Sequence, residues 1–485
     1  MIRISCKNER FTYDMYHIVK SFLPDAEISQ KVDPEQELLI EMTAEEEPDL
    51  GEQACDKKVR WTFFHCREAE IADISEKREQ KRYINKKLYQ TLVKKTGEEH
   101  AWGNMTGVRP TKMIMERLEE GSSEEEIIRY MHDTYVVSEK KSMLGIEIAK
   151  REKAQLDKLD YENGYSLYIG IPFCPTTCSY CSFTSYPVAK WQDRMDEYVD
   201  ALLKELAFIA EVSKEKHLNA IYMGGGTPTT LSAQQMDRVL SFLEEHFSFE
   251  HLKEYTIEAG RPDSITEDKL RVIRKHGVGR ISINPQTMQQ KTLDVIGRRH
   301  TVEDVVRIFH LARELGFDNI NMDLIVGLPG EDITKVQHTL DEVKDLGPDS
   351  LTVHSLAVKR AARLNIFRDK YQEMTFENNQ EIMNLTMKTA YEMGMGPYYL
   401  YRQKNMKGNF ENVGYSEVDK AGIYNILIME EKQPIIALGA GGSSKLVFDH
   451  GQRIERVENV KDVVNYITRI DEMIERKREG IAKWL

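Results

Sequence analysis

The feature that most restricts the fold of this chain is a regular alternation of short apolar runs and amphipathic segments that begins at Tyr165. The amphipathic stretches, such as residues 196–212 and 233–247, have the helical period. Repetition of this β–α unit implies parallel strands with right-handed crossovers, and six units fit a partial (β/α)6 barrel. Active sites of such folds gather at the carboxyl ends of the strands. The six runs are SLYIGIPF (166–173), NAIYMGGG (219–226), EYTIEAG (254–260), RISINPQT (280–287), NINMDLIVG (319–327) and SLTVHSLAV (350–358).

The barrel pattern is flanked by two other regions. Residues 1–160 have the pattern of an α+β domain of unknown role, residues 161–366 form the α/β barrel core, and residues 367–485 form a mainly helical region expected to cover the substrate. The elements expected in the flanking regions are strands at 1–8, 37–44 and 59–66 and helices at 11–23, 79–95, 123–159, 376–393 and 460–478.

The composition excludes several classes of protein. A formal net charge of −13 argues against nucleic-acid binding, which requires a basic surface that releases counterions. No run of about 18 apolar residues is present, so we expect no membrane span. The N-terminal sequence lacks the apolar stretch of a signal peptide, which makes a cytoplasmic protein the expectation. Six cysteines in 485 residues do not form a secreted disulfide framework.

Three of the six cysteines directly follow the first β-like run. Cys174, Cys178 and Cys181 have the spacing C-x3-C-x2-C, with Tyr180 just before the last of them. Three thiolates on one loop can bind three irons of a [4Fe–4S] cluster and leave the fourth iron open. An open iron can chelate the amino and carboxylate groups of S-adenosylmethionine (SAM), and reductive cleavage of SAM yields a carbon radical that abstracts hydrogen. The spacing therefore predicts a radical SAM enzyme.

A structural zinc site and a set of three buried thiols without a ligand are the alternatives to a cluster. Zinc normally takes four ligands, often as C-x2-C pairs or with a nearby histidine. The chain has no second cysteine pair, and the nearest histidine is distant in sequence. The position of the cysteines at the end of the first β–α strand favours the cluster.

Residues at the ends of the later strands suggest SAM contacts. The glycines at 224–226 let backbone approach a ligand without a Cβ clash, although a glycine triplet alone is more often a turn. Glu258, Gln286 and Asp323 end the third, fourth and fifth strands, where a lone polar residue is more often a cap or a loop anchor. Arg298 can pair with a carboxylate through a bidentate fork, or it is a solvated helix residue. Convergence of these residues on one rim favours ligand contacts.

These motifs resemble those of the oxygen-independent coproporphyrinogen III dehydrogenases (oxidases), a radical SAM family. The resemblance covers about residues 165–358 and rests on IGIPFCPTTCSYC, GGGTPTTL, INPQTM and MDLIVGLPG, in the same order and spacing. The flanking segments TGVRPTK, LYRQKNMKGNFENVGYS and ALGAGGSSK resemble the HemZ-type branch of that family.

The resemblance implies which residues carry the cofactors. It implies that Cys174, Cys178 and Cys181 are the cluster ligands and that Tyr168 is a further catalytic residue. It also implies that Tyr180 packs on the adenine of SAM. It also implies a reductant such as flavodoxin or ferredoxin and a tetrapyrrole substrate. The SAM contacts that it implies are Tyr168, Gly225, Gly226, Thr227, Glu258, Gln286, Arg298, Asp323 and, less directly, Ala357.

Two positions depart from the family pattern. Gly170 stands where catalytic members carry a histidine, and Phe183 stands where they carry a further cysteine. A phenylalanine at the second position resembles the related heme-chaperone branch. Both residues lie beside the cofactor, so three hypotheses stay open: a coproporphyrinogen III dehydrogenase, a heme-binding carrier, and a radical SAM enzyme that acts on another tetrapyrrole or on an unrelated substrate.

The first hypothesis implies oxidative decarboxylation of two propionates to vinyl groups, which gives protoporphyrinogen IX in heme biosynthesis. A substrate with four carboxylates requires cations at the barrel mouth. The candidates are Lys359, Arg360, Arg363, Arg402 and Lys404, each of which is otherwise a surface charge. The turn ALGAGGSSK offers backbone N–H groups to an anion, but its lysine is wrongly spaced for a Walker A loop.

Overall fold

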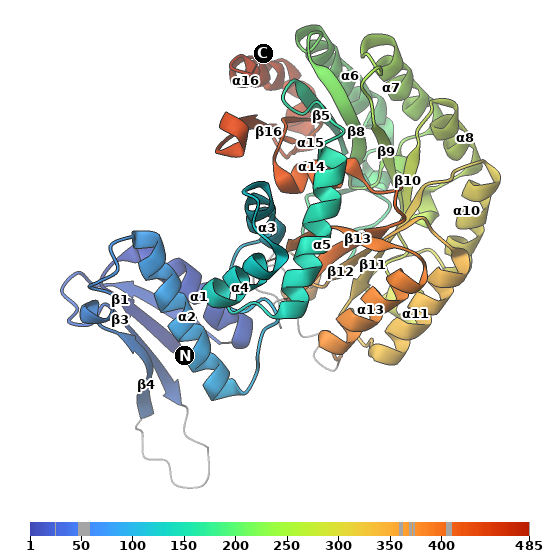
Figure 1. The fold of residues 1–485 in the computed structure, drawn as a ribbon. Helices are drawn as coiled ribbons and strands as arrows, with labels where there is room; N and C mark the ends of the chain where they lie inside the picture. Colours follow the sequence, from blue (N-terminus) through green and yellow to red (C-terminus); the bar gives the residue numbers. More distant parts are fainter. Residues whose placement is uncertain are drawn as a thin grey trace. The chain divides into compact units, whose positions relative to one another are not determined.

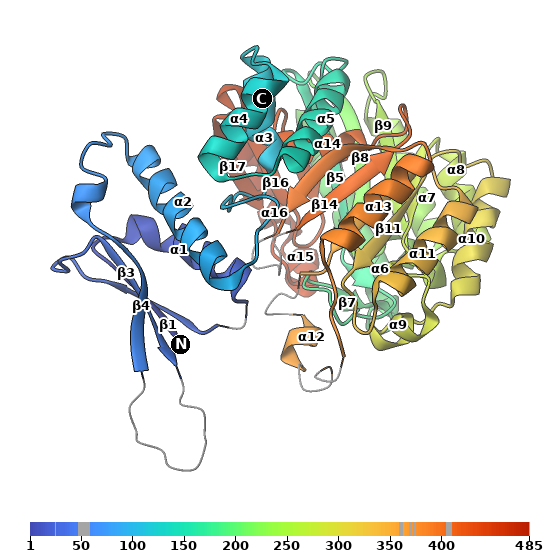
Figure 2. The same ribbon diagram turned by 60° about the horizontal axis from the view of Figure 1, so that its bottom comes forward.

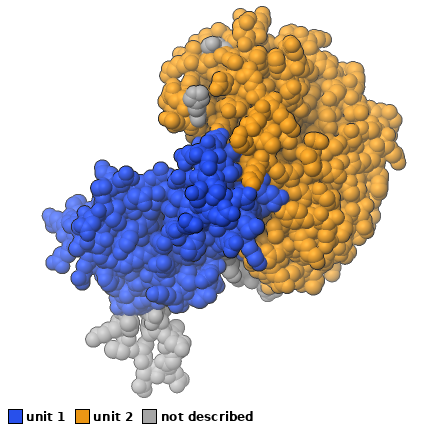
Figure 3. Space-filling view, viewed as in Figure 1, with its two compact units in different colours: residues 1–147, 401–411 blue, residues 148–400, 412–485 orange. Residues whose placement is uncertain are grey.

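The computed structural model describes residues 1–24, 26–46, 59–357, 362–367, 371, 374–403 and 410–484. The chain forms two compact units, coloured in Figure 3: unit 1 comprises residues 1–147 and 401–411, and unit 2 comprises residues 148–400 and 412–485. The boundaries expected at residues 160 and 366 both fall inside unit 2 and stay predictions. None of the helices in the described ranges is both long and apolar enough to cross a membrane.

Unit 1 contains a four-stranded sheet with the order β2-β1-β3-β4 among the described residues. The expected strands are confirmed as β1 (Ile2–Cys6), β3 (Ile40–Glu46) and β4 (Val59–Cys66). The sequence pattern missed β2 (Ile28–Val32), which pairs in parallel with β1, because this edge strand is largely exposed and lacks apolar alternation. The remaining elements of this unit are α1 (Thr12–Phe22), α2 (Lys77–Thr96), α3 (Pro110–Glu119), α4 (Glu124–Tyr135) and the start of α5 (Glu139–Leu156).

The single helix expected over residues 123–159 is wrong, because the chain breaks it into α4 and α5. Val136, the residue after α4, adopts a left-handed conformation with φ 58°. The carbonyl of Tyr135 accepts a hydrogen bond from the N–H of Asn104 at 2.9 Å instead of continuing the helix. Contacts with a distant loop, which the local periodicity does not reveal, therefore end α4.

Unit 2 confirms the α/β class and the six parallel strands predicted from the sequence. The described residues form an eleven-stranded sheet with the order β13-β14-β12-β11-β10-β9-β8-β5-β15-β16-β17. The strands from β12 to β15 in this order are parallel, whereas β14, β16 and β17 join by antiparallel pairing. The six predicted strands are β5 (Gly164–Ile171), β8 (His217–Gly225), β9 (Glu254–Gly260), β10 (Arg280–Ile283), β11 (Ile320–Val326) and β12 (Ser350–Ser355).

Amphipathic helices cover the outer face of this sheet, as Figures 1 and 2 show. Their buried positions recur at helical spacing, and several begin with a capping residue, such as Ser232 before α7 and Thr301 before α10. The helices between the six strands are α6 (Met195–Val212), α7 (Ala233–His246), α8 (Glu267–Lys275), α9 (Gln290–Val295), α10 (Val302–Glu314) and α11 (Ile333–Leu346).

The C-terminal region confirms the helix expected at 376–393, but the single helix expected at 460–478 is wrong, because the chain breaks at Arg469 into two helices. The region also contains strands that the sequence pattern did not indicate. The strands extend both edges of the sheet, and β15 lies parallel to β5, next to the strand that leads to the cysteines. The elements are α12 (Arg363–Ile366), α13 (Gln380–Glu392), β13 (Gly396–Arg402), β14 (Glu411–Ser416), α14 (Ile423–Glu430), β15 (Ile435–Leu438), β16 (Ser443–Phe448), β17 (Arg453–Glu458), α15 (Val463–Thr468) and α16 (Ile470–Ile481).

Candidate active site

The loop with the three cysteines is closed at its base by a short ladder. Cys174 lies in β6 (Phe173–Cys174), which pairs in parallel with β7 (Tyr186–Pro187). The N–H of Thr227, after β8, donates to the carbonyl of Phe173 at 2.7 Å, and its hydroxyl donates to Cys174 Sγ at 3.7 Å. Cys174 is thus tied to the end of the neighbouring strand.

Gly225 and Gly226 sit where a side chain does not fit. Gly225 has φ +112°, a conformation that L side chains rarely adopt. A Cβ on Gly226 would lie 2.5 Å from the carbonyl oxygen of Phe173 and 3.0 Å from Cys174 Sγ. The close approach of these two backbone segments therefore requires glycine, while contact of the triplet with SAM stays a prediction.

Arg261 braces the cysteine loop from the third strand. Its guanidinium makes a bidentate pair with Asp263, at 2.9 and 2.6 Å. The same group donates to the carbonyl of Thr176 at 2.9 Å and to Cys178 Sγ at 3.7 Å. Arg261 is 3% exposed, so this positive charge acts on the loop with little screening.

The thiols fit a cluster better than a single metal ion. The pKa of the Cys174 thiol is raised to about 11, mainly by burial. The hydrogen bond from Thr227 lowers this pKa, whereas the nearby Cys178 and Cys181 contribute to raising it. Among the described residues, no three cysteine, histidine or acidic side chains converge closely enough to hold one ion. In a cubane each thiolate binds a different iron, so the three sulfurs stand farther apart. Iron would replace the proton of Cys174.

Glu258 lies beneath the glycine triplet and is the acid whose pKa is moved toward neutrality. The hydroxyl of Tyr222 donates to its carboxylate, and a Cβ on Gly224 would lie 2.9 Å from its Oε2. Burial raises the pKa of Glu258 to about 7, opposed by the bonds from Tyr222 and from the N–H of Gly225, while Asp323 raises it. This carboxyl can therefore change protonation near neutral pH when a ligand binds.

Three tyrosines stack inside the barrel beside this carboxyl. The rings of Tyr168 and Tyr222 are nearly parallel, with centroids 6.3 Å apart, and Tyr424 stacks on Tyr222 at 4.4 Å. The sequence motifs point to Tyr168 but not to the other two. The period of a strand places Tyr222 on the same face as Gly224, which is a usable signal. Tyr424 comes from α14 and has no motif around it.

The fourth and fifth strands are joined through Gln286, which follows β10, and Asp323, which lies in the middle of β11 rather than at its end as expected. Gln286 has φ 70°, and its N–H donates to the carbonyl of Asp323 at 2.9 Å. The Oε1 atom of Gln286 is buried without a hydrogen-bond partner, which fits a ligand donor at this rim. Burial favours a higher pKa for Asp323, but hydrogen bonds from His354, Asn321 and Thr352 outweigh it and lower the pKa, so that Asp323 stays ionised.

Arg298 is buried next to the cysteine loop rather than solvated. Its guanidinium donates to the carbonyl of Asn284 and to the hydroxyl of Tyr180, the latter at 3.2 Å. Its Nε has no partner. The charges of Tyr180 and Cys178 raise the pKa of Arg298 despite burial, which keeps it cationic. The structure thus joins Arg298 and Tyr180, and an unused donor remains on the guanidinium.

The remaining positions singled out from the sequence have simpler surroundings. Ala357 is half-buried two residues after β12. Phe183 is 74% exposed. A Cβ on Gly170 would lie 3.1 Å from the carbonyl of Leu438 in β15, which is tighter than most real contacts. The pairing of β5 with β15 therefore favours glycine at the position where catalytic relatives are expected to carry histidine.

A buried network holds the β15–β16 turn against the end of β5. The carboxylate of Glu205 pairs with Lys477 at 2.7 Å, and both side chains are fully buried. The same carboxylate accepts from the N–H of Gly439 at 2.9 Å and from the hydroxyl of Tyr466 at 2.7 Å. The N–H groups of the next three residues, Ala440, Gly441 and Gly442, also donate within the protein, to the Tyr198 hydroxyl and to the carbonyls of Val460 and Gly439. The expectation that this turn offers free backbone donors to an anion is therefore wrong for residues 439–442.

The structure places the five residues that we expected to bind substrate carboxylates in different surroundings. Arg363 on α12 is exposed and lies beside the cysteine loop, because the N–H of the next residue donates to the carbonyl of Ser179 at 2.8 Å. Arg402 as a cation of the barrel mouth is wrong: it is buried within unit 1, on the carbonyl of Met105. Lys359, Arg360 and Lys404 lie outside the described residues.

Comparison with known proteins identifies the family. A model of the radical SAM superfamily matches residues 168–397. The chain is 41% identical over 434 residues to the oxygen-independent coproporphyrinogen-III oxidase-like protein HemZ of Bacillus subtilis, covering 89% of this chain and 82% of that protein. The chain belongs to the radical SAM superfamily, in its HemZ-type branch. As a radical SAM protein, it uses a [4Fe–4S] cluster and SAM.

This radical SAM protein is also similar to a heme chaperone in sequence and to a solved oxidase in structure. The heme chaperone HemW of B. subtilis is 36% identical over 195 residues, which cover 40% of this chain and 51% of that protein. In solved structures, coproporphyrinogen III oxidase HemN of Escherichia coli matches with a TM-score of 0.52 and 24% identity, over 66% of this chain and 73% of that chain. The structural likeness confirms the fold, whereas the two names describe different activities.

Proposed function

We propose that this radical SAM protein is an oxidoreductase that decarboxylates two propionates of coproporphyrinogen III to vinyl groups. The observation that carries the proposal is the 41% identity with HemZ over most of both chains. When bound and reduced, the cluster supplies the electron that cleaves SAM, and the resulting radical removes hydrogen from the substrate. Each propionate then loses carbon dioxide and one further electron to an external acceptor.

The chain's own residues supply binding and orientation. Cys174, Cys178 and Cys181 would hold the cluster, and Gly226 lies against the first of these thiols. Gln286 and Arg298 each keep a buried polar atom without a partner, which the ribose and carboxylate of SAM would satisfy. The other SAM contacts proposed are Tyr168, Tyr180, Thr227, Glu258, Asp323 and Ala357.

A basic hollow beside the cysteine loop suits a substrate rich in carboxylates. The hollow measures about 460 Å³, and three of its lining residues are arginines. Guanidinium groups bind carboxylates through paired hydrogen bonds. We place the substrate's propionates here and expect a reductant such as flavodoxin or ferredoxin to reduce the cluster. The lining residues are Thr176, Thr177, Asp294, Gly297, Arg298, Arg299 and Arg363.

The test is an anoxic assay with coproporphyrinogen III, SAM and a competent reductant, on protein with a full cluster. The proposal expects 5′-deoxyadenosine, carbon dioxide and protoporphyrinogen IX to form together. Cleavage of SAM without decarboxylation contradicts it. Arg299→Gln tests the basic hollow: we expect the KM for the porphyrinogen to rise while SAM cleavage in its absence is unchanged.

A heme-binding carrier is the second candidate function. It is favoured by Gly170, by the exposed Phe183 and by the similarity to HemW. A carrier binds heme and passes it to apo-proteins without turning over a porphyrinogen. Heme titration followed by absorbance, on the same sample as the turnover assay, separates the two candidates: saturable, transferable heme with no carbon dioxide release selects the carrier.

A further inference from the structure

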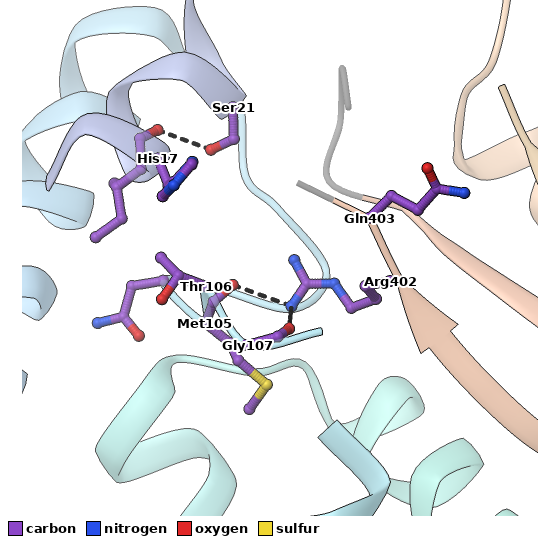
Figure 4. Close-up of a pocket in the computed structure, with 10 residues that line it drawn as sticks. His17, Ser21, Met105, Thr106, Gly107, Arg402 and Gln403 are labelled. Carbon is purple, nitrogen blue, oxygen red and sulfur yellow. Dashed lines mark hydrogen bonds between the residues drawn. The ribbon is translucent and has the colours of Figure 1, made fainter. Parts of the chain in front are cut away.

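Unit 1 contains a small hollow whose lining residues all belong to this unit. It measures about 20 Å³, more than one water needs but far less than a drug-sized ligand fills. Figure 4 shows Arg402 pointing its guanidinium toward the loop at Met105–Gly107, with His17 of α1 on the opposite side of the hollow. The residues that line it are His17, Ile18, Ser21, Gly103, Asn104, Met105, Thr106, Gly107, Arg402 and Gln403.

Arg402 is a buried cation whose hydrogen bonds are incomplete. It is 3% exposed, and its Nη1 donates to the carbonyls of Met105 and Gly107 at 3.0 and 3.4 Å. Its Nε is buried without a partner. Carbonyl oxygens satisfy donors but bring no negative charge, and a buried charge is costly unless it is paired.

Acids near Arg402 do not neutralise it. Glu411 is the acid whose charge acts on Arg402, but it forms an ion pair with Lys141 and accepts from Trp102 Nε1 at 2.7 Å. Asp14, near the hollow, pairs with Lys81 at 2.6 Å. Among the ion pairs of the described residues, Arg402 is absent, and burial lowers its pKa to about 10, as expected for a cation without a counter-ion.

The aromatic surroundings are also neutral. His100 stacks on Phe22 with centroids 3.9 Å apart. Burial, together with the charge of Arg402, lowers the pKa of His100 to about 4, so this imidazole carries no charge at neutral pH. The guanidinium carbon of Arg402 lies 5.8 Å from the Trp102 ring. Within the part of unit 1 that the structure describes, the hollow is thus a low-dielectric site at which the charge of Arg402 has no ion-pair partner.

We propose that this hollow binds a compact anionic group, a carboxylate or a phosphate, against Arg402. The anionic group provides the counter-charge that Arg402 lacks among the described residues of unit 1, and a small group fits the size of the hollow. It comes either from a free inorganic or carboxylic anion or from the end of a larger molecule whose body stays outside. The inference is independent of the porphyrinogen reaction, since all lining residues belong to unit 1.

The test is calorimetric titration of the full-length, cluster-loaded protein with phosphate, formate and chloride at constant ionic strength. We expect saturable binding of phosphate or formate near one equivalent, and Arg402→Gln to weaken it at least about tenfold, because a hydrogen bond to a charged group contributes that much. Arg60→Gln is the matched control: Arg60 lies in unit 1, is mostly exposed and already pairs with Glu45, so binding stays at the wild-type value.

If Arg402→Gln does not fold, Gly107→Asp gives the second test. A Cβ on Gly107 meets no atom within 4 Å, so the substitution is accommodated, and it adds a carboxylate to a residue whose carbonyl already accepts from Arg402. We expect this variant to melt at a higher temperature than the wild type and to lose the response to added anions. Absence of saturable binding to wild type, equal binding to Arg402→Gln, or an unchanged anion response in Gly107→Asp overturns the proposal. Binding of formate and phosphate alone indicates a free anion, whereas competition by a larger monocarboxylate with higher affinity indicates the end of a larger ligand.

Discussion

The close approach of Gly226 to the first cluster ligand gives a quantitative prediction for Gly226→Ala. The new Cβ would meet the carbonyl oxygen of Phe173 at 2.5 Å and Cys174 Sγ at 3.0 Å. The first of these is a backbone atom, so relief requires the chain to move at the residue before Cys174. Overpacking of this kind costs about 1–3 kcal/mol. If it destabilises the SAM-bound state relative to the free protein by this amount, the SAM affinity falls by about 5- to 150-fold.

The assay compares two alanine variants of the same unit. Gly279→Ala is the control, because a Cβ there meets no atom within 4 Å. Both proteins are reconstituted anaerobically, their iron and sulfide are measured, and SAM binding is determined by equilibrium dialysis. We expect Gly279→Ala to stay within about twofold of wild type, as an uncrowded surface change should. Equal iron content and equal SAM affinity in the two variants would refute the reasoning.

The buried charges give three more predictions. The pKa of Glu258 is about 7 in the folded protein, against an ordinary value of 4.5. Between these two pH values the folded state holds a proton that the unfolded state has lost. The free energy of unfolding therefore falls as pH rises through this range. Because Glu258→Gln cannot titrate at this position, its melting temperature, measured without SAM, should rise relative to that of wild type between about pH 5 and pH 8. A difference in melting temperature that stays constant over this range contradicts the assignment. Lys477→Met leaves the fully buried Glu205 unpaired and should lower the free energy of unfolding by about 3–5 kcal/mol in denaturant titrations, with partial recovery in Lys477→Met/Glu205→Leu. No recovery in the double variant would mean that packing, rather than the unpaired charge, dominates. Arg298→Lys keeps the charge but cannot bond Asn284 and Tyr180 together, and should weaken SAM binding about tenfold with cluster content retained; unchanged affinity contradicts a role in SAM binding.

The parts of the fold that depend on local repetition could be predicted from the sequence. The β–α alternation after Tyr165 predicts the parallel strands, and it places Glu258 near the end of β9 and Gln286 just after β10. Asp323, which we also expected at a strand end, lies in the middle of β11. The spacing of Cys174, Cys178 and Cys181 has a similarly local meaning.

What the sequence did not reveal depends on contacts between distant segments. Tyr424 reaches the barrel interior from α14, some 200 residues after Tyr222, and nothing in its neighbourhood marks it. β15 becomes a parallel neighbour of β5 although only four residues form it. Arg402 has the sequence context of a surface cation, in an aromatic and basic stretch, yet its segment belongs to unit 1. In each case tertiary packing, which has no local period, decides the position.

The central claim is that three thiols hold a cluster with one iron left for SAM, and electron paramagnetic resonance of the reduced, reconstituted protein tests it most directly. We predict an iron–sulfur signal that changes shape when SAM is added and that is lost when Cys174, Cys178 and Cys181 are all replaced by alanine. A signal that persists in the triple variant, or one that SAM leaves unaltered, contradicts the claim.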